Sequence, residues 1–383
     1  GKLMDFLKKQ QGNEKSHTIE GDKVNSAIDG LIEKVGMFAM EKKAIVRDGS
    51  YCVDFKFSKD DVSEIVRRLD SLGYEYIEIG HGKGLNASSY ENGISLQTDT
   101  EYMEAANATR KNAKLGFFCI PGIARLEDLS LAVNNGIQFV RIGQNADEME
   151  SVKEYVLKAK ELGLEVMVNF MKTYIISPEK FARDAKMVGD WGADCVYVVD
   201  SSGGMLPEQV LSYYKQARLK TNVKLGIHCH NNMGLAVYNS LVAYDCGYDF
   251  IDTTLQGVGR SVGNTMAESF IMALEKRGHD MGFDIPRLLE YGYYVNNKII
   301  GRPAVNPLDL MCGFADFHSS HLKDIYRCCL EKKVDPLRLI LKYCQYDKKG
   351  MDYQKLCAVA EELPIDNDEN PYDFRKYFES IYR

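Results

Sequence analysis

Short apolar runs alternate with amphipathic segments along most of this sequence, and no other feature limits its possible folds as strongly. Eight such runs occur within roughly 235 residues, which is the length typical of a (β/α)8 barrel. The runs end near Arg47, Gly80, Ile120, Ile142, Asn169, Asp200, His228 and Asp252. Helical patterns separate them, for example at residues 149–162, 177–191, 207–219, 235–246 and 265–276. The alternation therefore predicts an α/β protein with a closed, parallel TIM barrel.

An open, doubly wound sheet is the alternative for a chain in which strands and helices alternate. Such sheets usually have fewer strands and carry a glycine-rich phosphate-binding turn after the first strand. Here the first run is followed by Arg47-Asp48-Gly49-Ser50-Tyr51, which lacks that pattern. We therefore expect the barrel.

Two segments fall outside the repeat. Residues 1–43 are rich in Lys, Glu, Gln and Asn, and an amphipathic stretch at residues 25–38 predicts a helical N-terminal extension. Residues 44–280 form the predicted barrel domain. Residues 281–383 predict a helical C-terminal domain, and the two prolines in residues 302–307 indicate a rigid connection within it.

The composition excludes several classes of protein. The 383 residues are 45% hydrophobic and 27% charged, which is ordinary for a soluble globular protein. We expect no membrane contact and a cytoplasmic location, since no apolar run approaches the ~18 residues of a membrane helix. A net charge of −7 argues against a general nucleic-acid binder. The ten scattered cysteines are expected to be reduced thiols in the core rather than a disulfide framework.

Two histidines close the seventh run, in Ile227-His228-Cys229-His230. Alternate side chains of a strand point to one face, so the two imidazoles can reach a common point. Neutral imidazole is the commonest metal ligand in proteins, and such a pair needs only a carboxylate and water to complete a divalent site. The alternative is that both histidines are simply polar residues at a strand end.

The barrel geometry supplies the carboxylate. Active sites of such barrels lie at the carboxyl ends of the strands, and Asp48 follows the first run as the histidines follow the seventh. Only the eighth strand separates the first from the seventh in a closed barrel. Asp48, His228 and His230 are thus predicted to hold Mn²⁺ foremost, with Mg²⁺, Co²⁺ or Zn²⁺ as alternatives. A turn or cap is the competing role for Asp48.

Five motifs in the same order resemble those of the 4-hydroxy-2-oxovalerate aldolases. These are metal-dependent pyruvate aldolases of the barrel metallolyase group, which includes 3-hydroxy-3-methylglutaryl-CoA lyase and isopropylmalate synthase. The resemblance runs from about residue 44 to residue 364. The motifs are Arg47-Asp48-Gly49, Gly80-His81-Gly82-Lys83-Gly84, Val199-Asp200-Ser201, His228-Cys229-His230-Asn231-Asn232 and Gly257-Val258-Gly259-Arg260-Ser261-Val262-Gly263-Asn264.

The resemblance implies a class II aldolase, a carbon–carbon lyase that acts on 4-hydroxy-2-oxo acids. Pyruvate would chelate the metal through its keto and carboxylate oxygens, and Arg47 would steady the enolate that forms when the bond to the aldehyde breaks. His81 would line the substrate pocket. Asn264 would join the metal shell or bind a carboxylate, unless it only caps a helix.

The sequence departs from the family where the catalytic base should be. Two residues after the glycine of the aspartate motif, the family has a histidine and this chain has Tyr51, whose usual pKa of ~10 makes it a poor base at neutral pH. The family's tyrosines near residues 313–320 are also missing, and His318 stands in that stretch. We therefore predict that Tyr51 and His318 take part in proton transfer, with packing as the alternative for His318.

Two other functions remain open. One is a Claisen-type acyl transfer from acetyl-CoA to a 2-oxo acid, although residues 50–51 lack the further charged residues usual in those synthases. The other is a barrel that keeps its metal but has no catalytic activity, which the lost histidine supports. Lys172, after the fifth run, could instead form a Schiff base, but a metal site makes that unnecessary. By the resemblance we also expect a homodimer through the C-terminal region, and relatives often pair with an aldehyde dehydrogenase.

Overall fold

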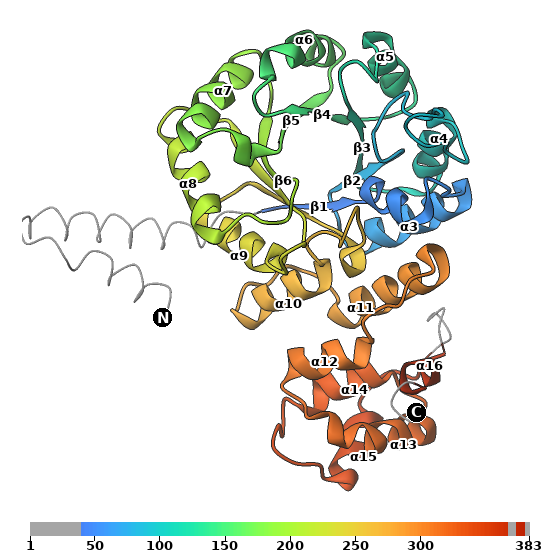
Figure 1. The fold of residues 1–383 in the computed structure, drawn as a ribbon. Helices are drawn as coiled ribbons and strands as arrows, with labels where there is room; N and C mark the ends of the chain where they lie inside the picture. The colour runs from blue at the N-terminus through green and yellow to red at the C-terminus, as the bar shows by residue number, and fades with distance from the viewer. Residues whose placement is uncertain (1–39, 367–372, 380–383) are drawn as a thin grey trace, which may run out of the picture.

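The computed structural model describes residues 40–366 and 373–379 (Figure 1). Eight parallel strands form a closed barrel in sequence order, and β1 pairs with β8 to complete it. The predicted TIM barrel is therefore confirmed. The strands are β1 (Glu41–Ile45), β2 (Tyr76–Ile79), β3 (Lys114–Cys119), β4 (Phe139–Asn145), β5 (Glu165–Met171), β6 (Cys195–Asp200), β7 (Lys224–Cys229) and β8 (Phe250–Thr253).

Helices surround the barrel on the outside (Figure 1). They are α3 (Lys59–Ser71), α4 (Asp99–Thr109), α5 (Leu126–Asn134), α6 (Lys153–Glu161), α7 (Pro178–Asp190), α8 (Pro207–Arg218), α9 (Ala236–Cys246) and α10 (Ala267–Lys276). Local sequence sets their ends. At α3, for example, the Ser58 hydroxyl accepts the Asp61 backbone N–H, and the Asp61 carboxylate accepts the Ser58 backbone N–H. This capping box stabilises the first turn by about 1 kcal/mol.

Short helical turns carry the loops at the carboxyl ends of several strands. They are the 3₁₀ turns η1 (Arg47–Val53), η2 (Met149–Val152), η3 (Thr173–Ile175) and η4 (Leu255–Gly257). The turn η1 starts within two residues of the end of β1, so the side chains of Arg47 and Asp48 remain at the barrel mouth.

A helical region follows the barrel, as predicted. It contains α11 (Ile285–Tyr294), the π-helix η5 (Val295–Ile300), α12 (Pro307–Ala315), η6 (Ser319–His321), α13 (Leu322–Lys332), α14 (Pro336–Tyr343), α15 (Tyr353–Glu361) and α16 (Arg375–Phe378). Helices α12–α16 gather on one side of the barrel, next to α10 and α11 (Figure 1). Their buried side chains belong to the same hydrophobic cluster as the barrel helices.

Two of the predicted boundaries need comment. The first strand begins at Glu41 rather than at Ala44, because Glu41 and Lys42 pair with Phe250 and Ile251 of β8 although their side chains are polar. The helical stretch predicted at residues 25–38 lies outside the described residues, as does most of the charged C-terminal tail. No helix in the described part of the chain is long and apolar enough to cross a membrane.

Side chains fill the barrel interior in two levels. The first inward-facing residues of β2, β4 and β8 are Tyr76, Phe139 and Phe250, near the amino ends, and they form one apolar cluster with Met167, Cys195, Tyr197 and Val199. Two residues further along β2, β4 and β8 come Glu78, Arg141 and Asp252, at most 2% exposed. Since inward-facing positions recur every second residue, these charges form a second level between the apolar one and the mouth.

Candidate metal centre at the barrel mouth

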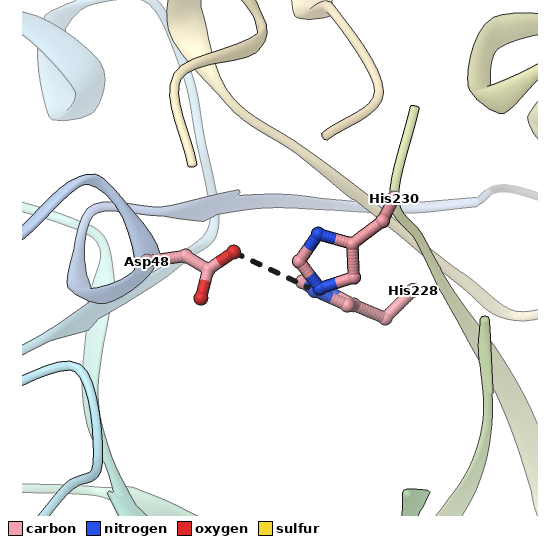
Figure 2. A group of neighbouring side chains, drawn as sticks. All are labelled: Asp48, His228 and His230. Atoms are coloured by element: carbon pink, nitrogen blue, oxygen red, sulfur yellow. Dashed lines mark ion pairs between the residues drawn. The ribbon is translucent and has the colours of Figure 1, made fainter. Parts of the chain in front are cut away.

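Three side chains from two loops of the barrel meet at its mouth. Asp48 comes from η1, His228 from the end of β7, and His230 follows β7 directly. One ligand atom of each lies within 4.8 Å of the others (Figure 2). Asp48 and His228 are buried, and His230 is half-buried. The Nε2 atom of His228 is 3.8 Å from Oδ2 of Asp48. The structure thus brings together the three residues predicted to hold a metal.

The protonation states of these groups suit a divalent cation. Burial, followed by repulsion from His228, lowers the pKa of His230 to about 4, so this imidazole is neutral at pH 7. Its Nδ1 atom is buried and has no hydrogen-bond partner among the described residues. Burial alone would raise the pKa of Asp48, but Arg47 and the two histidines hold it well below its usual range. A carboxylate and imidazole nitrogens with free lone pairs form a donor set that a divalent metal fits.

A second carboxylate fixes the ring of His228. Oδ2 of Asp252 lies 2.9 Å from Nδ1 of His228, which leaves Nε2 pointing toward Asp48. Carboxylates that accept a proton from the far ring nitrogen commonly orient histidine ligands and increase their basicity. A role for Asp252 could not be predicted from the sequence, because only a short apolar run surrounds it there.

Asp252 belongs to a buried charged layer that we define by Lys43, Glu78, Arg141 and Asp252. Nη2 of Arg141 is 2.8 Å from Asp252, and Nη1 of Arg141 donates to Glu78 at 2.9 Å. Lys43 lies 3.6 Å from Glu78 and 3.8 Å from Asp252. A charged residue in the middle of an apolar strand is the sequence signal of this layer. The signal shows that a charge is buried, but not which strand supplies its partner.

Arg47 connects this layer to the metal centre. Its Nε donates to Glu78, and its Nη1 lies 3.1 Å from Asp48 and donates to the Gly82 carbonyl at 2.8 Å. Burial opposes the charged form, yet Glu78 and Asp48 raise the pKa of Arg47. The guanidinium therefore stays charged, is held in place, and lines the cavity at the mouth.

Tyr51 also lines this cavity. Its ring packs against Gly82, where an added Cβ would come within 2.5 Å of it, and the Arg260 guanidinium lies 5.3 Å from the ring centre. Burial raises the pKa of Tyr51. The phenol is therefore neutral at pH 7, so in this state it can donate a proton or a hydrogen bond and is a poor base.

Asn264 reaches the metal centre from the loop after β8. Its Nδ2 donates to Oδ2 of Asp48 at 2.8 Å, and its backbone forms an isolated bridge with His230. Its Oδ1 atom is buried and has no hydrogen-bond partner within the described chain. The side chain is therefore placed to orient Asp48, which is closer to the predicted role in the metal shell than to that of a helix cap.

Two predicted histidines lie elsewhere. His81 is 1% exposed and stacked on Phe55, with Nδ1 accepting the Lys83 backbone N–H and Nε2 at 3.0 Å from the Gly93 carbonyl. Both ring nitrogens are thus used in the loop after β2, and His81 is absent from the cavity lining. His318 is exposed at the start of η6, where its ring caps the turn through Ser320. The structure does not bring His318 to the metal centre.

The cavity at the barrel mouth has a volume of about 550 Å³. Besides the metal-centre residues, it is lined by apolar side chains, neutral polar ones and three further cations. The lining residues are Arg47, Asp48, Tyr51, Gly82, Lys83, Phe118, Ile120, Ile123, Asn145, Asn169, Met171, Lys172, Tyr174, Val199, Ser201, His228, His230, Asn232, Arg260 and Ser261. A cavity of this size at the strand carboxyl ends is where such barrels bind their substrates.

The HMGL-like family model matches residues 43–295, which include the whole barrel beyond its first two strand residues. The chain belongs to the HMGL-like family. This HMGL-like chain is also 36% identical to a 4-hydroxy-2-oxovalerate aldolase of Geobacillus genomosp. 3, over 85% of the chain and 98% of that relative. A protein of the same name from Carboxydothermus hydrogenoformans is 32% identical over 85% of the chain and 97% of its own length. The resemblance predicted from the five motifs is therefore confirmed.

Another similar relative carries a different name. An oxaloacetate decarboxylase of Mycobacterium tuberculosis is 38% identical over 73% of the HMGL-like chain and 83% of its own length. Among solved structures, hydroxymethylglutaryl-CoA lyase from Pseudomonas aeruginosa has a TM-score of 0.59 at 16% identity, covering 70% of this chain and 96% of that one. The carboxyl transferase domain of Rhizobium etli pyruvate carboxylase has a TM-score of 0.60 at 14% identity, covering 88% and 63%. These two structural matches show the shared fold.

Proposed function

We propose that this protein is a divalent-metal-dependent class II aldolase that cleaves or forms a carbon–carbon bond between pyruvate and an aldehyde. The observation that carries the proposal is the convergence of Asp48, His228 and His230 beside the charged guanidinium of Arg47 in one cavity. The relatives named 4-hydroxy-2-oxovalerate aldolase, which match nearly their whole length, support the same reaction.

The chain's own residues prepare the site for an enolate. Cleavage next to a carbonyl leaves negative charge on the former keto oxygen, and a divalent metal, when bound, would supply Lewis-acid stabilisation of that charge. Arg47 is held by Glu78, Asp48 and the Gly82 carbonyl, so its guanidinium needs no reorganisation when charge develops. Asn264 orients Asp48, and Asp252 orients His228.

Proton transfer is assigned to Tyr51. Its pKa is raised and it lines the cavity, so we propose that it donates a proton to the enolate carbon, or a hydrogen bond to the reacting oxygen. The imidazoles that line the cavity within the described chain are those of His228 and His230, both assigned to the metal. Removal of a proton from a substrate hydroxyl would then fall to a water molecule rather than to His318.

Hydrogen exchange at the pyruvate methyl group tests the aldolase directly. The purified protein is incubated with pyruvate in D₂O and Mn²⁺, Mg²⁺, Co²⁺ or Zn²⁺, the metal is removed with a chelator, and the methyl signal is measured by NMR. We expect metal-dependent loss of the signal, because enolisation needs no aldehyde. No exchange with any of the four metals would exclude the proposal and favour a non-catalytic barrel.

Decarboxylation of a 3-carboxylated 2-oxo acid is a second candidate, favoured because the described residues that line the cavity include no imidazole besides His228 and His230. When oxaloacetate loses CO₂, the electron pair of the broken bond passes into the keto group and gives the enolate of pyruvate. No hydroxyl has to be deprotonated, and the later protonation of the enolate needs only an acid such as Tyr51. The relative named oxaloacetate decarboxylase agrees with this reaction.

The two candidates are separated by the substrate that is consumed. Metal-dependent release of CO₂ from oxaloacetate, above the rate with metal alone, would support decarboxylation. Release of an aldehyde from 4-hydroxy-2-oxo acids, with no catalysis of oxaloacetate loss, would support the aldolase alone. Thiol release from acetyl-CoA with a 2-oxo acid would point instead to acyl transfer.

The remaining features belong to the same proposal. We propose Mn²⁺ as the metal, a domain division at residues 43/44 and 280/281, a cytoplasmic location, and a homodimer through the helical region that starts at α11. Light scattering of the full chain tests the dimer, and metal analysis of protein purified without chelator tests the metal. Pairing with an aldehyde dehydrogenase stays a prediction.

A further inference from the structure

Three cations line the cavity outside the metal centre. They are Lys83, Lys172 and Arg260, and they come from the loops after β2, β5 and β8. Asp48, at the metal centre, is the only carboxylate among the described lining residues. The cavity wall is therefore strongly basic, although the whole chain has a net charge of −7.

These cations have no carboxylate partner within the described chain. Nζ of Lys83 donates to the amide oxygen of Asn92 at 2.9 Å, and Arg260 lies over the ring of Tyr51. The Lys172 ammonium forms no hydrogen bond or ion pair with the described residues, although its backbone N–H donates to the Ser201 hydroxyl at 2.9 Å. Elsewhere on the surface, cations such as Lys160 and Arg277 form ion pairs at 2.8 and 2.9 Å. The charges at the mouth are thus left available to a bound anion.

The backbone around two of these cations is unusual. Lys172 has a φ of 55°, and Ser261, directly after Arg260, has a φ of 61°. Non-glycine residues in the left-handed region cost about 1 kcal/mol or more and occur preferentially where a loop serves a site. The loops are therefore held in conformations that local sequence does not favour, and in both loops the affected residue carries or adjoins a cation of the cavity wall.

The cavity is also larger than a small substrate requires. Its volume of about 550 Å³ lies within the ~300–1,000 Å³ range of pockets that enclose ligands larger than a five-carbon 4-hydroxy-2-oxo acid. A neutral two-carbon aldehyde would also leave the three cations without a partner.

We propose that the aldehyde half of the substrate carries its own anionic group, a carboxylate or a phosphate, which binds between Lys83, Lys172 and Arg260. This inference rests on the proposed aldolase function and names the substrate class of that site. The carboxylate of pyruvate would lie at the metal end of the cavity, so the substrate would be anionic at both ends. The basic rim also increases the rate at which such a substrate is captured.

A binding experiment tests the anion site without turnover. The probes are 2-oxopentanedioate and 2-oxopentanoate, which lack a 4-hydroxyl group and differ only in a terminal carboxylate or methyl group. Calorimetry is performed with the Mn²⁺-loaded and the metal-free protein. At low salt we expect the dicarboxylate to bind about tenfold more tightly, and the preference to shrink in ~1 M salt, where the Debye length is about 3 Å. Equal affinities for the two probes would contradict the anion site.

A kinetic experiment separates the two possible anions. Pyruvate is supplied with 4-oxobutanoate or butanal, and with glyceraldehyde 3-phosphate or glyceraldehyde. We expect kcat/KM to be at least about tenfold higher for the anionic member of one pair, and that pair identifies a carboxylate or a phosphate. Arg260→Gln should reduce this ratio by about threefold. Arg183→Gln, which removes an exposed arginine on the outer helix α7, should leave the ratio unchanged.

The outcomes separate this inference from the proposed function. If pyruvate exchanges its methyl hydrogens but both aldehyde pairs give ratios near one, the inference is wrong and the aldolase stands. If no exchange occurs with any metal, the aldolase proposal fails and calorimetry decides alone. In that case, tighter dicarboxylate binding that is lost in Arg260→Gln supports the anion site, and equal affinities overturn it.

Discussion

The charges of the buried charged layer are paired with opposite charges, whereas the cations on the rim of the cavity are not paired with carboxylates of the described residues. In the layer, Lys43, Glu78, Arg141 and Asp252 each lie within 4 Å of an opposite charge and are at most 2% exposed. On the rim, Lys83, Lys172 and Arg260 have no carboxylate partner within the described residues. Yet the two regions are connected, since Arg47 contacts Glu78 below and the cavity above.

The difference separates charges that hold other side chains in position from charges that can bind a ligand. A buried ion pair costs several kcal/mol of desolvation per ion, and its partners and extra hydrogen bonds offset that cost only in a fixed geometry. Such a layer can hold Arg47 and His228 in place. Leaving a solvated cation on the rim without a partner costs little free energy, so the cation remains available to bind an anionic ligand. Mutations in the two regions should therefore affect different quantities.

The largest effect is expected in the layer. Arg141→Leu removes a 0% exposed guanidinium that pairs with both Glu78 and Asp252, and leaves each of these buried carboxylates one charged partner short. Breaking a buried pair in this way costs about 3–5 kcal/mol. Urea unfolding at pH 7 with a chelator present measures the loss.

Arg260→Leu is the matched control on the rim. It also replaces an arginine by leucine, but Arg260 is exposed and its contact is the ring of Tyr51. Its free energy of unfolding should change by less than about 0.5 kcal/mol. Similar losses in the two variants would mean that the layer and the rim do not differ in the way described.

The layer should also control metal affinity through Asp252. Asp252→Asn weakens the support of His228 Nδ1, and loss of such support typically lowers metal affinity by about 10–100-fold. Glu78→Gln is the control, because it also removes a carboxylate from Arg141 but has no contact with His228. Calorimetric titration with Mn²⁺ compares the two variants. If Glu78→Gln weakened binding as much as Asp252→Asn, the effect would come from the charge of the layer and not from orientation of the ring.

The fold and the convergence of Asp48, His228 and His230 could be predicted because both follow from the positions of residues in the strand pattern. Strand and helix patterns alternate clearly, and in a barrel every strand end reaches the same mouth, so His228, His230 and Asp48 could be placed together without any knowledge of contacts. The charged layer could not be predicted in this way. The pairing of Arg141 with Glu78 and Asp252 joins β4 to β2 and β8, and it depends on the register of the closed sheet.

The histidine predictions show a second limit. His81 and His318 were singled out because of their residue type and motif position, but neither property fixes the direction of a loop. The side chain of His81 packs within the loop that carries it, against Phe55 and the Gly93 carbonyl. His318 caps a turn in the helical region. Tyr51, in contrast, reaches the cavity because Gly82 leaves room for its ring, a contact between two separate loops.

An intermediate effect is expected at Tyr51, which is neutral and lines the cavity proposed as the active site. Tyr51→Phe removes only the hydroxyl, and the loss of one hydrogen-bond or proton donor should slow pyruvate methyl exchange by about tenfold at pH 7. Mn²⁺ affinity should not change. Tyr174→Phe is the control, because Tyr174 also lines the cavity but is 40% exposed. Equal slowing in both variants would remove Tyr51 from proton transfer.

The smallest effect is expected at Lys43, which belongs to the same buried charged layer as Arg141 but differs from it in the direction of its pKa shift. Burial, followed by repulsion from Arg141, lowers the pKa of Lys43 to about 8, whereas the pKa of Arg141 is raised although burial opposes its charge. The attraction of Glu78 and Asp252 therefore fails to compensate for the burial of Lys43. Lys43→Met should change the free energy of unfolding at pH 7 by less than about 1 kcal/mol, toward higher stability.

The pH dependence of this difference gives the sign of the Lys43 contribution. In the unfolded chain Lys43 keeps its proton up to its ordinary pKa of 10.5, whereas in the folded protein it loses the proton at about 8. Between these values the unfolded state binds more protons, so the stability of the wild type relative to Lys43→Met should rise with pH, by at most about 1.4 kcal/mol per pH unit. Below pH 8 the difference should be constant. Urea unfolding of both proteins from pH 7 to 10 measures it, and a difference that stays constant over this range would mean that the layer stabilises the charged form of Lys43 as it does that of Arg141.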